Sequence, residues 1–168
     1  FFQYNSIMPT ILILSIDPGY ELLEIAIIEK TGAEKEVLAY SDCFKTSTKL
    51  EFIERLKLLG EELNRVIQEF DPNVFAIEKL FFNTNQKTAT NVSEVRGALL
   101  YVALVSGLQV YEYTPLQIKT AITGDGRSDK ERMMWMLPKL IHIDKEIKHD
   151  DEYDAIAVGL TCFASERL

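Results

Sequence analysis

Acidic residues end two segments of the chain that read as buried, and begin a third. Asp17 directly follows the run at residues 11–16, Glu78 follows the run at residues 73–77, and DDEYD at residues 150–154 precedes the last apolar segment. Carboxylates that meet within a few ångströms repel one another unless cations are bound, and hard ions such as Mg²⁺ prefer oxygen ligands. Two such ions about 4 Å apart can activate a water and clamp a scissile phosphate. Convergence of these acids would therefore indicate phosphodiester hydrolysis.

Most of these acids also have a simpler structural interpretation. Asp17 precedes a Pro-Gly pair and suits a turn, and acids at residues 150–152 suit the first turn of a helix, where they interact favourably with the helix dipole. Glu78 is harder to explain in this way, because it follows an apolar strand and precedes Leu80-Phe81-Phe82, where a solvated acid has no obvious structural purpose. The functional interpretation therefore depends on whether the fold brings the acids together.

Two acidic pairs share a face of the last predicted helix. Asp151 and Asp154 are three residues apart, and Asp150 and Asp154 are four apart. Both spacings place side chains on the same side of a helix. Spacing alone therefore leaves the partner of Asp154 open between Asp150 and Asp151.

The apolar pattern predicts an α/β fold that would position these acids. Runs separated by turn residues predict a three-stranded antiparallel meander, followed by two parallel strands. Periodicity typical of helices separates and follows the later strands, so helices should cover both faces of a mixed sheet. The strands are expected at residues 11–17, 21–29, 37–44, 73–77 and 109–113, and the helices at residues 50–70, 88–106, 115–122, 129–140 and 150–165.

The first and fourth predicted strands each end on an acid. If these strands are parallel neighbours, Asp17 and Glu78 lie side by side at the carboxyl edge of the sheet. Open α/β sheets bind their ligands at that edge. A last helix packed on the sheet would then hold the acids of residues 150–154 against the same place.

Length and composition predict one globular domain. The chain has 168 residues, 47% hydrophobic and 26% charged, which suits a single core at residues 11–168. Residues 1–10, FFQYNSIMPT, are interpreted as an N-terminal extension or an upstream remnant, with Met8 as the natural start. The sequence shows neither a signal-peptide layout nor an apolar run of roughly 18 residues, so we expect a cytoplasmic protein without a membrane partner.

Charge and cysteine content limit the function classes. Cys43 and Cys162 form no CxxC pair and are expected to be buried reduced thiols rather than zinc ligands. The net charge of -8 is unusual for a protein that binds nucleic acid. A local basic surface or bound metal ions would have to offset it.

Four segments together resemble the RuvC-type Holliday-junction resolvases. They are IDPG at 16–19, FAIEKLFF at 75–82, VYEYTPLQIKTAITGDGRSDK at 110–130 and DDEYDAIAVG at 150–159, in family order and at family distances. The resemblance implies an RNase H-like fold with a five-stranded mixed sheet flanked by helices. It also implies a homodimeric crossover junction endodeoxyribonuclease that cuts four-way DNA junctions in recombination and repair. RuvA and RuvB branch-migration proteins are the implied partners.

The resemblance assigns roles to individual acids. Carried over by position, the acidic tetrad falls on Asp17, Glu78, Asp151 and Asp154. These residues would be both catalytic and the ligands of two Mg²⁺ ions, with Mn²⁺ as a substitute. The assignment also favours Asp151 over Asp150 as the partner of Asp154.

The resemblance and the neighbouring loops suggest DNA contacts as well. Phe81 matches a family aromatic that stacks on a base near the crossover, and the adjacent Phe82 could share that role or pack in the core. Lys119 and Lys130 fall on family positions that contact phosphates. Solvated surface charge is the alternative for each basic residue, including two further candidates on the same loop-rich face, Lys87 and Arg127. For Arg96, a dimer contact, a DNA contact and a surface ion pair all stay open.

One departure from the family pattern lies close to the first acid. The family usually has Thr-Gly where this chain has Leu23-Glu24. Glu24 adds a negative charge near the expected substrate path, and the isoelectric point is about 4.8. A catalytically weak or inactive junction-binding protein of the same fold is therefore the alternative. A third class, the actin-like or sugar-kinase ATPases, is disfavoured because residues 20–22 would not cradle a triphosphate and 168 residues are expected to be too few for the second lobe that these enzymes need.

Overall fold

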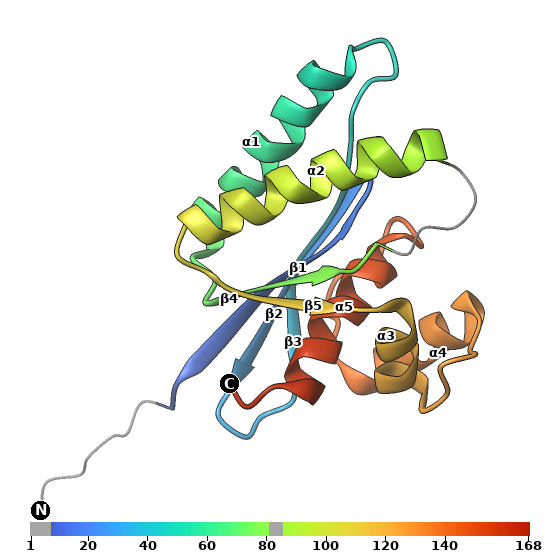
Figure 1. Cartoon of the computed structure of the whole chain (residues 1–168). Helices are drawn as coiled ribbons and strands as arrows, with labels where there is room; N and C mark the ends of the chain where they lie inside the picture. The colour runs from blue at the N-terminus through green and yellow to red at the C-terminus, as the bar shows by residue number, and fades with distance from the viewer. Residues whose placement is uncertain (1–7, 81–85) are drawn as a thin grey trace, which may run out of the picture.

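The computed structural model describes residues 8–80 and 86–168. A mixed sheet runs through the middle of the molecule in the order β3-β2-β1-β4-β5 (Figure 1). The first three strands pair antiparallel as a meander, and β4 and β5 run parallel to β1. This confirms the predicted combination of a meander with two parallel strands. The strands are β1 (Thr10–Pro18), β2 (Leu22–Thr31), β3 (Val37–Lys45), β4 (Val74–Glu78) and β5 (Gln109–Tyr113).

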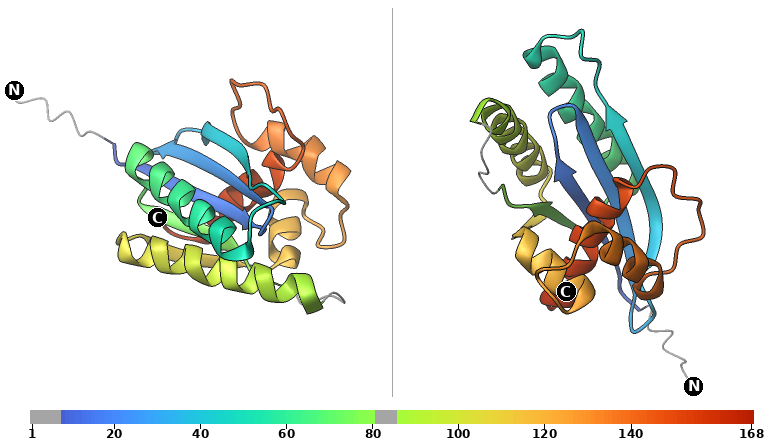
Figure 2. Two further views of the ribbon diagram at one scale, coloured as in Figure 1. Left: turned by 90° about the horizontal axis from the view of Figure 1, so that it is seen from above. Right: turned by 90° about the vertical axis from the view of Figure 1, so that its right-hand side faces the viewer.

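Helices cover both faces of the sheet, as predicted (Figure 2). One face packs against α1 (Phe52–Phe70) and α2 (Gln86–Val105) around a cluster of buried hydrophobic residues. On the other face α5 (Glu152–Ser165) crosses β1 and β2. Two shorter helices, α3 (Pro115–Thr123) and α4 (Lys130–Leu140), pack against α5.

The contact between α5 and the sheet is unusually close at one glycine. A Cβ atom at Gly159 would lie 2.6 Å from Ser15 Oγ and 2.7 Å from Ile28 Cδ1, so no larger residue fits without movement. The Ser15 hydroxyl also donates a hydrogen bond to the carbonyl of Ala155 at 2.8 Å. The start of α5 is therefore held close to β1, which carries Asp17 next to its last residue.

The boundaries of two elements differ from the prediction in ways that concern the acids. β4 includes Glu78, which pairs in register with Tyr113 of β5. The last helix begins at Glu152 rather than at residue 150, with Asp151 as its N-cap residue. The Glu152 side chain accepts hydrogen bonds from the backbone N–H groups of Lys148 and His149, at 2.9 and 3.1 Å. These bonds hold the preceding residues in a turn, and the helix therefore begins two residues later than predicted.

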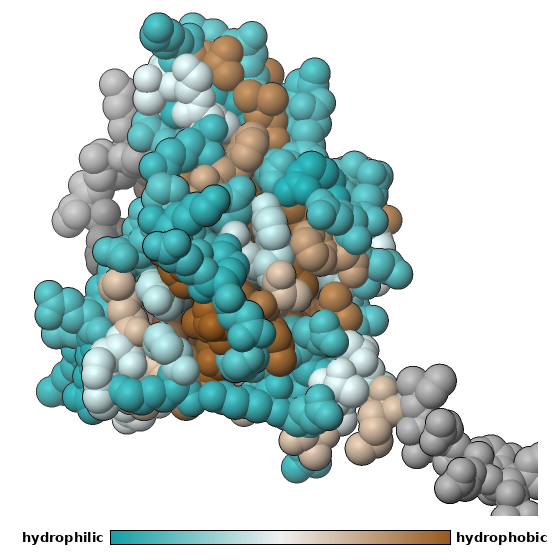
Figure 3. Space-filling view, turned by 180° about the vertical axis from the view of Figure 1, so that it is seen from behind, coloured by the Kyte–Doolittle hydropathy of each residue, from teal (hydrophilic) through white to brown (hydrophobic). Residues whose placement is uncertain are grey.

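The hydrophilic surface and the two buried cysteines agree with what the composition predicts. Seen from behind, hydrophilic residues cover most of the molecule and apolar residues show in patches between them (Figure 3). Cys43 and Cys162 are free and buried, as predicted. Within the described part of the chain, no helix has the length and apolar character needed to cross a membrane.

Candidate active site

The sheet topology brings the first two acids to the same edge. β1 and β4 are parallel neighbours, and Ile16 pairs with Ile77. Asp17 and Glu78 each follow one member of that pair, so both lie where the two strands end. The predicted convergence at the carboxyl edge is confirmed.

A third acid reaches this edge from α5, and a fourth from β2. Carboxylate oxygens of Asp17, Glu24 and Asp154 all lie within 4.8 Å of one another. Asp154 stands in the first turn of α5. Glu24 is the direct partner of Asp17 in the antiparallel pairing of β1 and β2. Sequence reasoning noted Glu24 as a departure but did not place it among the site residues, and the β1–β2 register is the signal that would have done so.

A pocket beside this cluster contains further predicted residues. Its lining includes Asp17, Glu78 and Asp154 together with the two basic residues Lys119 and Lys130. The ammonium of Lys130 lies 2.9 Å from Asp151 Oδ1 and 2.8 Å from Asp154 Oδ2. Asp151 is therefore linked to the other acids through Lys130, and the structure brings all four predicted acids to one region.

Burial raises the pKa of Asp17, Glu24 and Glu78, and the neighbouring acids raise it further. The pKa of Asp17 rises to about 6, with repulsion from Asp154 as the second cause after burial. The pKa of Glu78 rises to about 8 and that of Glu24 to about 9, in both cases through burial and then through the charge of Asp17. Without a cation the edge of the sheet therefore disfavours full ionisation.

The two lysines of the pocket act against this repulsion. Lys119 lowers the pKa of Glu78, and Lys130 lowers that of Asp17 and Glu24. Partial burial alone would lower the pKa of Lys130, but its hydrogen bonds to Asp154 and Asp151 raise it overall. Lys130 therefore stays charged and pairs with the acids of α5. Its predicted contact with DNA phosphate stays a prediction.

Of the remaining predicted DNA contacts, the structure describes the side chain of Arg127 alone. Arg127 is exposed in the turn that precedes α4. Phe81, Phe82 and the side chain of Lys87 lie outside the described residues. Their roles therefore stay predictions, drawn from the family resemblance and the sequence alone.

Arg96, left open by the sequence, supports the strand that carries Glu78. Its Nε donates a hydrogen bond to the main-chain carbonyl of Glu78 at 3.1 Å, and its guanidinium pairs with Glu112 of β5. An arginine that holds the carbonyl of an acidic residue restrains the backbone from which that side chain projects. Sequence reasoning found no signal for this contact, because the residues concerned lie on α2, β4 and β5.

The donor set fits a hard divalent cation. Asp17, Glu24 and Asp154 supply carboxylate oxygens, which Mg²⁺ and Mn²⁺ prefer. Glu24 Oε2 is shielded from solvent and has no hydrogen-bond partner among residues 8–80 and 86–168. A buried carboxylate oxygen without a partner is unfavourable, and a cation between the three acids would satisfy it.

Comparisons with known proteins agree with this geometry. The model of the family described as crossover junction endodeoxyribonuclease RuvC matches residues 13–162. A RuvC from Halothermothrix orenii is 39% identical over 157 residues, which cover 94% of each chain. A RuvC from Caldicellulosiruptor saccharolyticus is 42% identical over 88% of this chain and 89% of its own.

Solved structures show the same fold. The structure of Thermus thermophilus RuvC in complex with Holliday junction substrate superimposes with a TM-score of 0.82 and 30% identity, over 90% of this chain and 92% of that one. The yeast mitochondrial Holliday junction resolvase has a TM-score of 0.72, over 95% of this chain and 80% of its own. At 14% identity that second likeness concerns the fold alone.

Proposed function

The chain belongs to the RuvC family of crossover junction endodeoxyribonucleases, and from this premise we propose that it resolves four-way DNA junctions by hydrolysing phosphodiester bonds. Its fold is the RNase H-like mixed sheet of that family. The observation that carries the proposal is the convergence of acids from β1, β4 and α5 at one edge of the sheet. A relative of known structure contains Holliday junction substrate, which supports a junction as the DNA class.

We assign the metal site to the tetrad of Asp17, Glu78, Asp151 and Asp154. Two divalent ions held there, Mg²⁺ in the first instance and Mn²⁺ as a substitute, would supply an activated water and stabilise the leaving oxygen. The carboxylates fix the position of these charges against the sheet edge. The acids are anchored through β1, β4 and α5 rather than through loops alone, so the site is preorganised.

The basic residues of the pocket have a separate role in this proposal. Lys119 lies beside Glu78, and Lys130 bridges Asp151 and Asp154. A cation bound to these aspartates would compete with Lys130 and release its ammonium toward a DNA phosphate. Arg127, Lys87, Phe81 and Phe82 would extend the DNA contact beyond the pocket, with an aromatic ring stacked on a base.

Several further features follow from the family rather than from the geometry. We infer a homodimer that cuts two opposed strands and works in the cytoplasm with RuvA and RuvB branch-migration proteins. We also propose that the chain from β1 onward forms a single nuclease domain, which begins at Thr10 rather than at the predicted residue 11. The alternative, a junction-binding protein without turnover, is not favoured, because all four acids of the tetrad are present and gathered.

A cleavage assay with isosteric variants tests the proposal. We expect the wild-type chain to cut a synthetic four-way junction, but not linear duplex or fork DNA, and only when Mg²⁺ is present. Asp17→Asn should reduce the cleavage rate by at least about a thousandfold, a loss of about 4 kcal/mol of transition-state stabilisation, while junction binding in a gel-shift assay is retained.

The matched control lies two residues before the last helix. Asp150→Asn removes an exposed acid next to the tetrad and should leave cleavage unchanged, whereas Asp151→Asn should behave like Asp17→Asn. Cleavage at the wild-type rate by Asp17→Asn would show that the metal site is wrongly assigned. Equal losses in Asp150→Asn and Asp151→Asn would contradict the choice of Asp151.

A further inference from the structure

We propose that Glu24 is a fifth carboxylate of the metal site and binds a divalent cation together with Asp17 and Asp154. The inference rests on the proposed function, because it adds a ligand to the site assigned there. It concerns a residue outside the tetrad and at a place where this chain departs from the family pattern.

The sheet fixes the position of Glu24. It is the direct cross-strand partner of Asp17, and side chains at paired positions of antiparallel strands lie on the same face about 5 Å apart. Its neighbours Leu23 and Ile25 are fully buried in the cluster on the α1–α2 side. Because side chains alternate along a strand, Glu24 must point to the opposite face, where α5 packs.

Asp154 meets this pair from the helix. It stands in the first turn of α5, which is held against β1 through Ser15 and Gly159. The oxygens of the three acids thereby come within 4.8 Å of one another. The three ligands come from two paired strands and a packed helix, so their approach does not depend on a loop conformation.

Glu24 lacks the lysine partner that Asp151 and Asp154 share. Lys130 forms ion pairs with both Asp151 and Asp154, but within residues 8–80 and 86–168 no ion pair reaches Glu24. Its Oε2 is buried and has no hydrogen-bond partner among the same residues. A proton would remove the charge and leave that oxygen unsatisfied, whereas a divalent cation would satisfy both the charge and the oxygen.

The proposal predicts cation binding before DNA arrives. In many two-metal sites the substrate phosphate completes the coordination shell. A further carboxylate supplies a protein ligand and a negative charge in advance, and the number of charged ligands raises the affinity for a divalent ion. The departure at Leu23-Glu24 would then tighten metal binding in the DNA-free protein.

Titration with Mn²⁺ in the absence of DNA tests the inference. The full chain is titrated while free Mn²⁺ is followed by electron paramagnetic resonance, and Glu24→Gln is compared with the wild type. We expect the Kd for Mn²⁺ to rise at least about tenfold in Glu24→Gln, since even residues that merely support ligands change metal affinity by about 10–100-fold.

Two variants make the result specific. Glu29→Gln removes a carboxylate from the same strand, five residues away from Glu24 and outside the site, and should change the Kd by less than about twofold. Glu24→Asp keeps the charge and should bind Mn²⁺ more tightly than Glu24→Gln. Circular dichroism and thermal unfolding with EDTA confirm that each variant is folded.

The outcomes separate this inference from the proposed function. If Asp17→Asn weakens Mn²⁺ binding and Glu24→Gln binds as the wild type does, the site stands and Glu24 is not a ligand. If neither Asp17→Asn nor Glu24→Gln changes the Kd, the metal site itself is wrong and the proposed function fails with it. Equal affinities of the wild type, Glu24→Asp and Glu24→Gln would likewise overturn the inference.

Discussion

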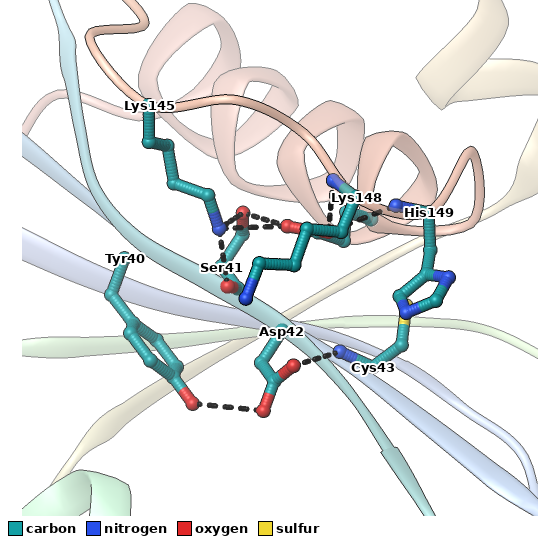
Figure 4. Close-up of polar contacts among 8 residues, drawn as sticks. Tyr40, Ser41, Asp42, Cys43, Lys145, Lys148 and His149 are labelled. Carbon is teal, nitrogen blue, oxygen red and sulfur yellow. Dashed lines mark hydrogen bonds and ion pairs between the residues drawn. The ribbon is translucent and has the colours of Figure 1, made fainter.

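Two glutamates on the α5 side of the sheet have opposite surroundings. Glu152, 1% exposed at the start of α5, accepts hydrogen bonds from Lys145 Nζ at 2.8 Å, from the hydroxyl of Ser41 and from two backbone N–H groups. Glu24 has a buried oxygen without any hydrogen-bond partner in the described part of the chain. Figure 4 shows Ser41, Lys145, Lys148 and His149, which supply the partners of Glu152.

The pKa values of the two glutamates follow these surroundings. Burial opposes ionisation of Glu152, but the hydrogen bonds from Lys145 and Ser41 and from the backbone outweigh it and lower the pKa. At Glu24 burial and the neighbouring acids act in the same direction, and the pKa rises to about 9. The carboxylate of Glu152 thus has hydrogen-bond partners within the protein. Glu24, which we propose as a cation ligand, has a buried oxygen without such a partner in the described part of the chain.

The two sites are nevertheless connected along the chain. Glu152 stands between Asp151 and Asp154, and its hydrogen bonds to Lys148 and His149 hold the turn that leads into α5. Ser41 belongs to β3, so the same side chain ties the start of the helix to the sheet. We therefore regard the Glu152 contacts as the support that holds Asp154 close to the other acids despite their mutual repulsion.

The largest expected effect comes from removing the satisfied glutamate. Glu152→Ala leaves two backbone N–H groups without their acceptor and breaks the ion pair of Lys145, which keeps its hydrogen bonds to Ser41. Loss of one partner of buried hydrogen bonds costs about 1–3 kcal/mol. We expect a decrease of that size in the free energy of unfolding, measured by urea denaturation with EDTA present. Glu146→Ala, an exposed glutamate of the same loop, should cost less than about 0.5 kcal/mol. An equal decrease in the free energy of unfolding for the two variants would show that the contacts of Glu152 do not stabilise the fold.

The acidic site was easier to predict from the sequence than the contacts of Glu152 that support it. Asp17 and Glu78 were predictable because each ends a buried strand, and parallel strands end at a common edge. Glu24 required the register of the first hairpin, which depends on where the turn at residues 19–21 closes. The contacts of Glu152 were not predictable, because Ser41 lies 111 residues away in the chain and nothing in the local pattern indicates which strand faces the start of α5.

The pH should change the stability as well, with opposite signs for Glu152 and for Glu24. Because the pKa of Glu152 is lowered on folding, its stabilisation is present above the unfolded value of 4.5 and is lost as the pH falls. Because the pKa values of Glu78 and Glu24 are raised to about 8 and about 9, the folded state loses stability as the pH rises from about 4.5 to about 9. The metal-free protein should therefore be most stable near the bottom of that range.

Thermal unfolding between pH 5 and pH 9 measures this effect. In EDTA the Tm should fall as the pH rises, by about 2–4 °C for each kcal/mol lost in a chain of this size. Glu24→Gln should show a flatter profile, and Glu29→Gln should follow the wild type. Saturating Mg²⁺ should raise the Tm most at high pH, because the cation binds the ionised acids of the folded state. A Tm that is independent of pH in EDTA would show that folding does not raise the pKa values of these acids.

The smallest effect is expected at Arg96. This residue holds the strand end that carries Glu78, as Lys145 holds Glu152 at the start of α5. Its hydrogen bond to the Glu78 carbonyl and its ion pair with Glu112 restrain the end of β4. Arg96→Met removes both contacts but leaves every acid of the site in place. We expect the cleavage rate at saturating junction to fall about tenfold, which corresponds to about 1.4 kcal/mol, with little change in junction binding.

The control for Arg96 has similar contacts in another part of the molecule. Arg65 on α1 pairs with Glu62 and Glu69 on its own helix, so Arg65→Met also removes ion pairs but none that reach a strand end. It should leave the cleavage rate within about twofold of the wild type. If both arginine variants cut at the same rate, Arg96 does not position Glu78. If Arg96→Met alone is slow, support of the strand end contributes to turnover even though Arg96 supplies no carboxylate.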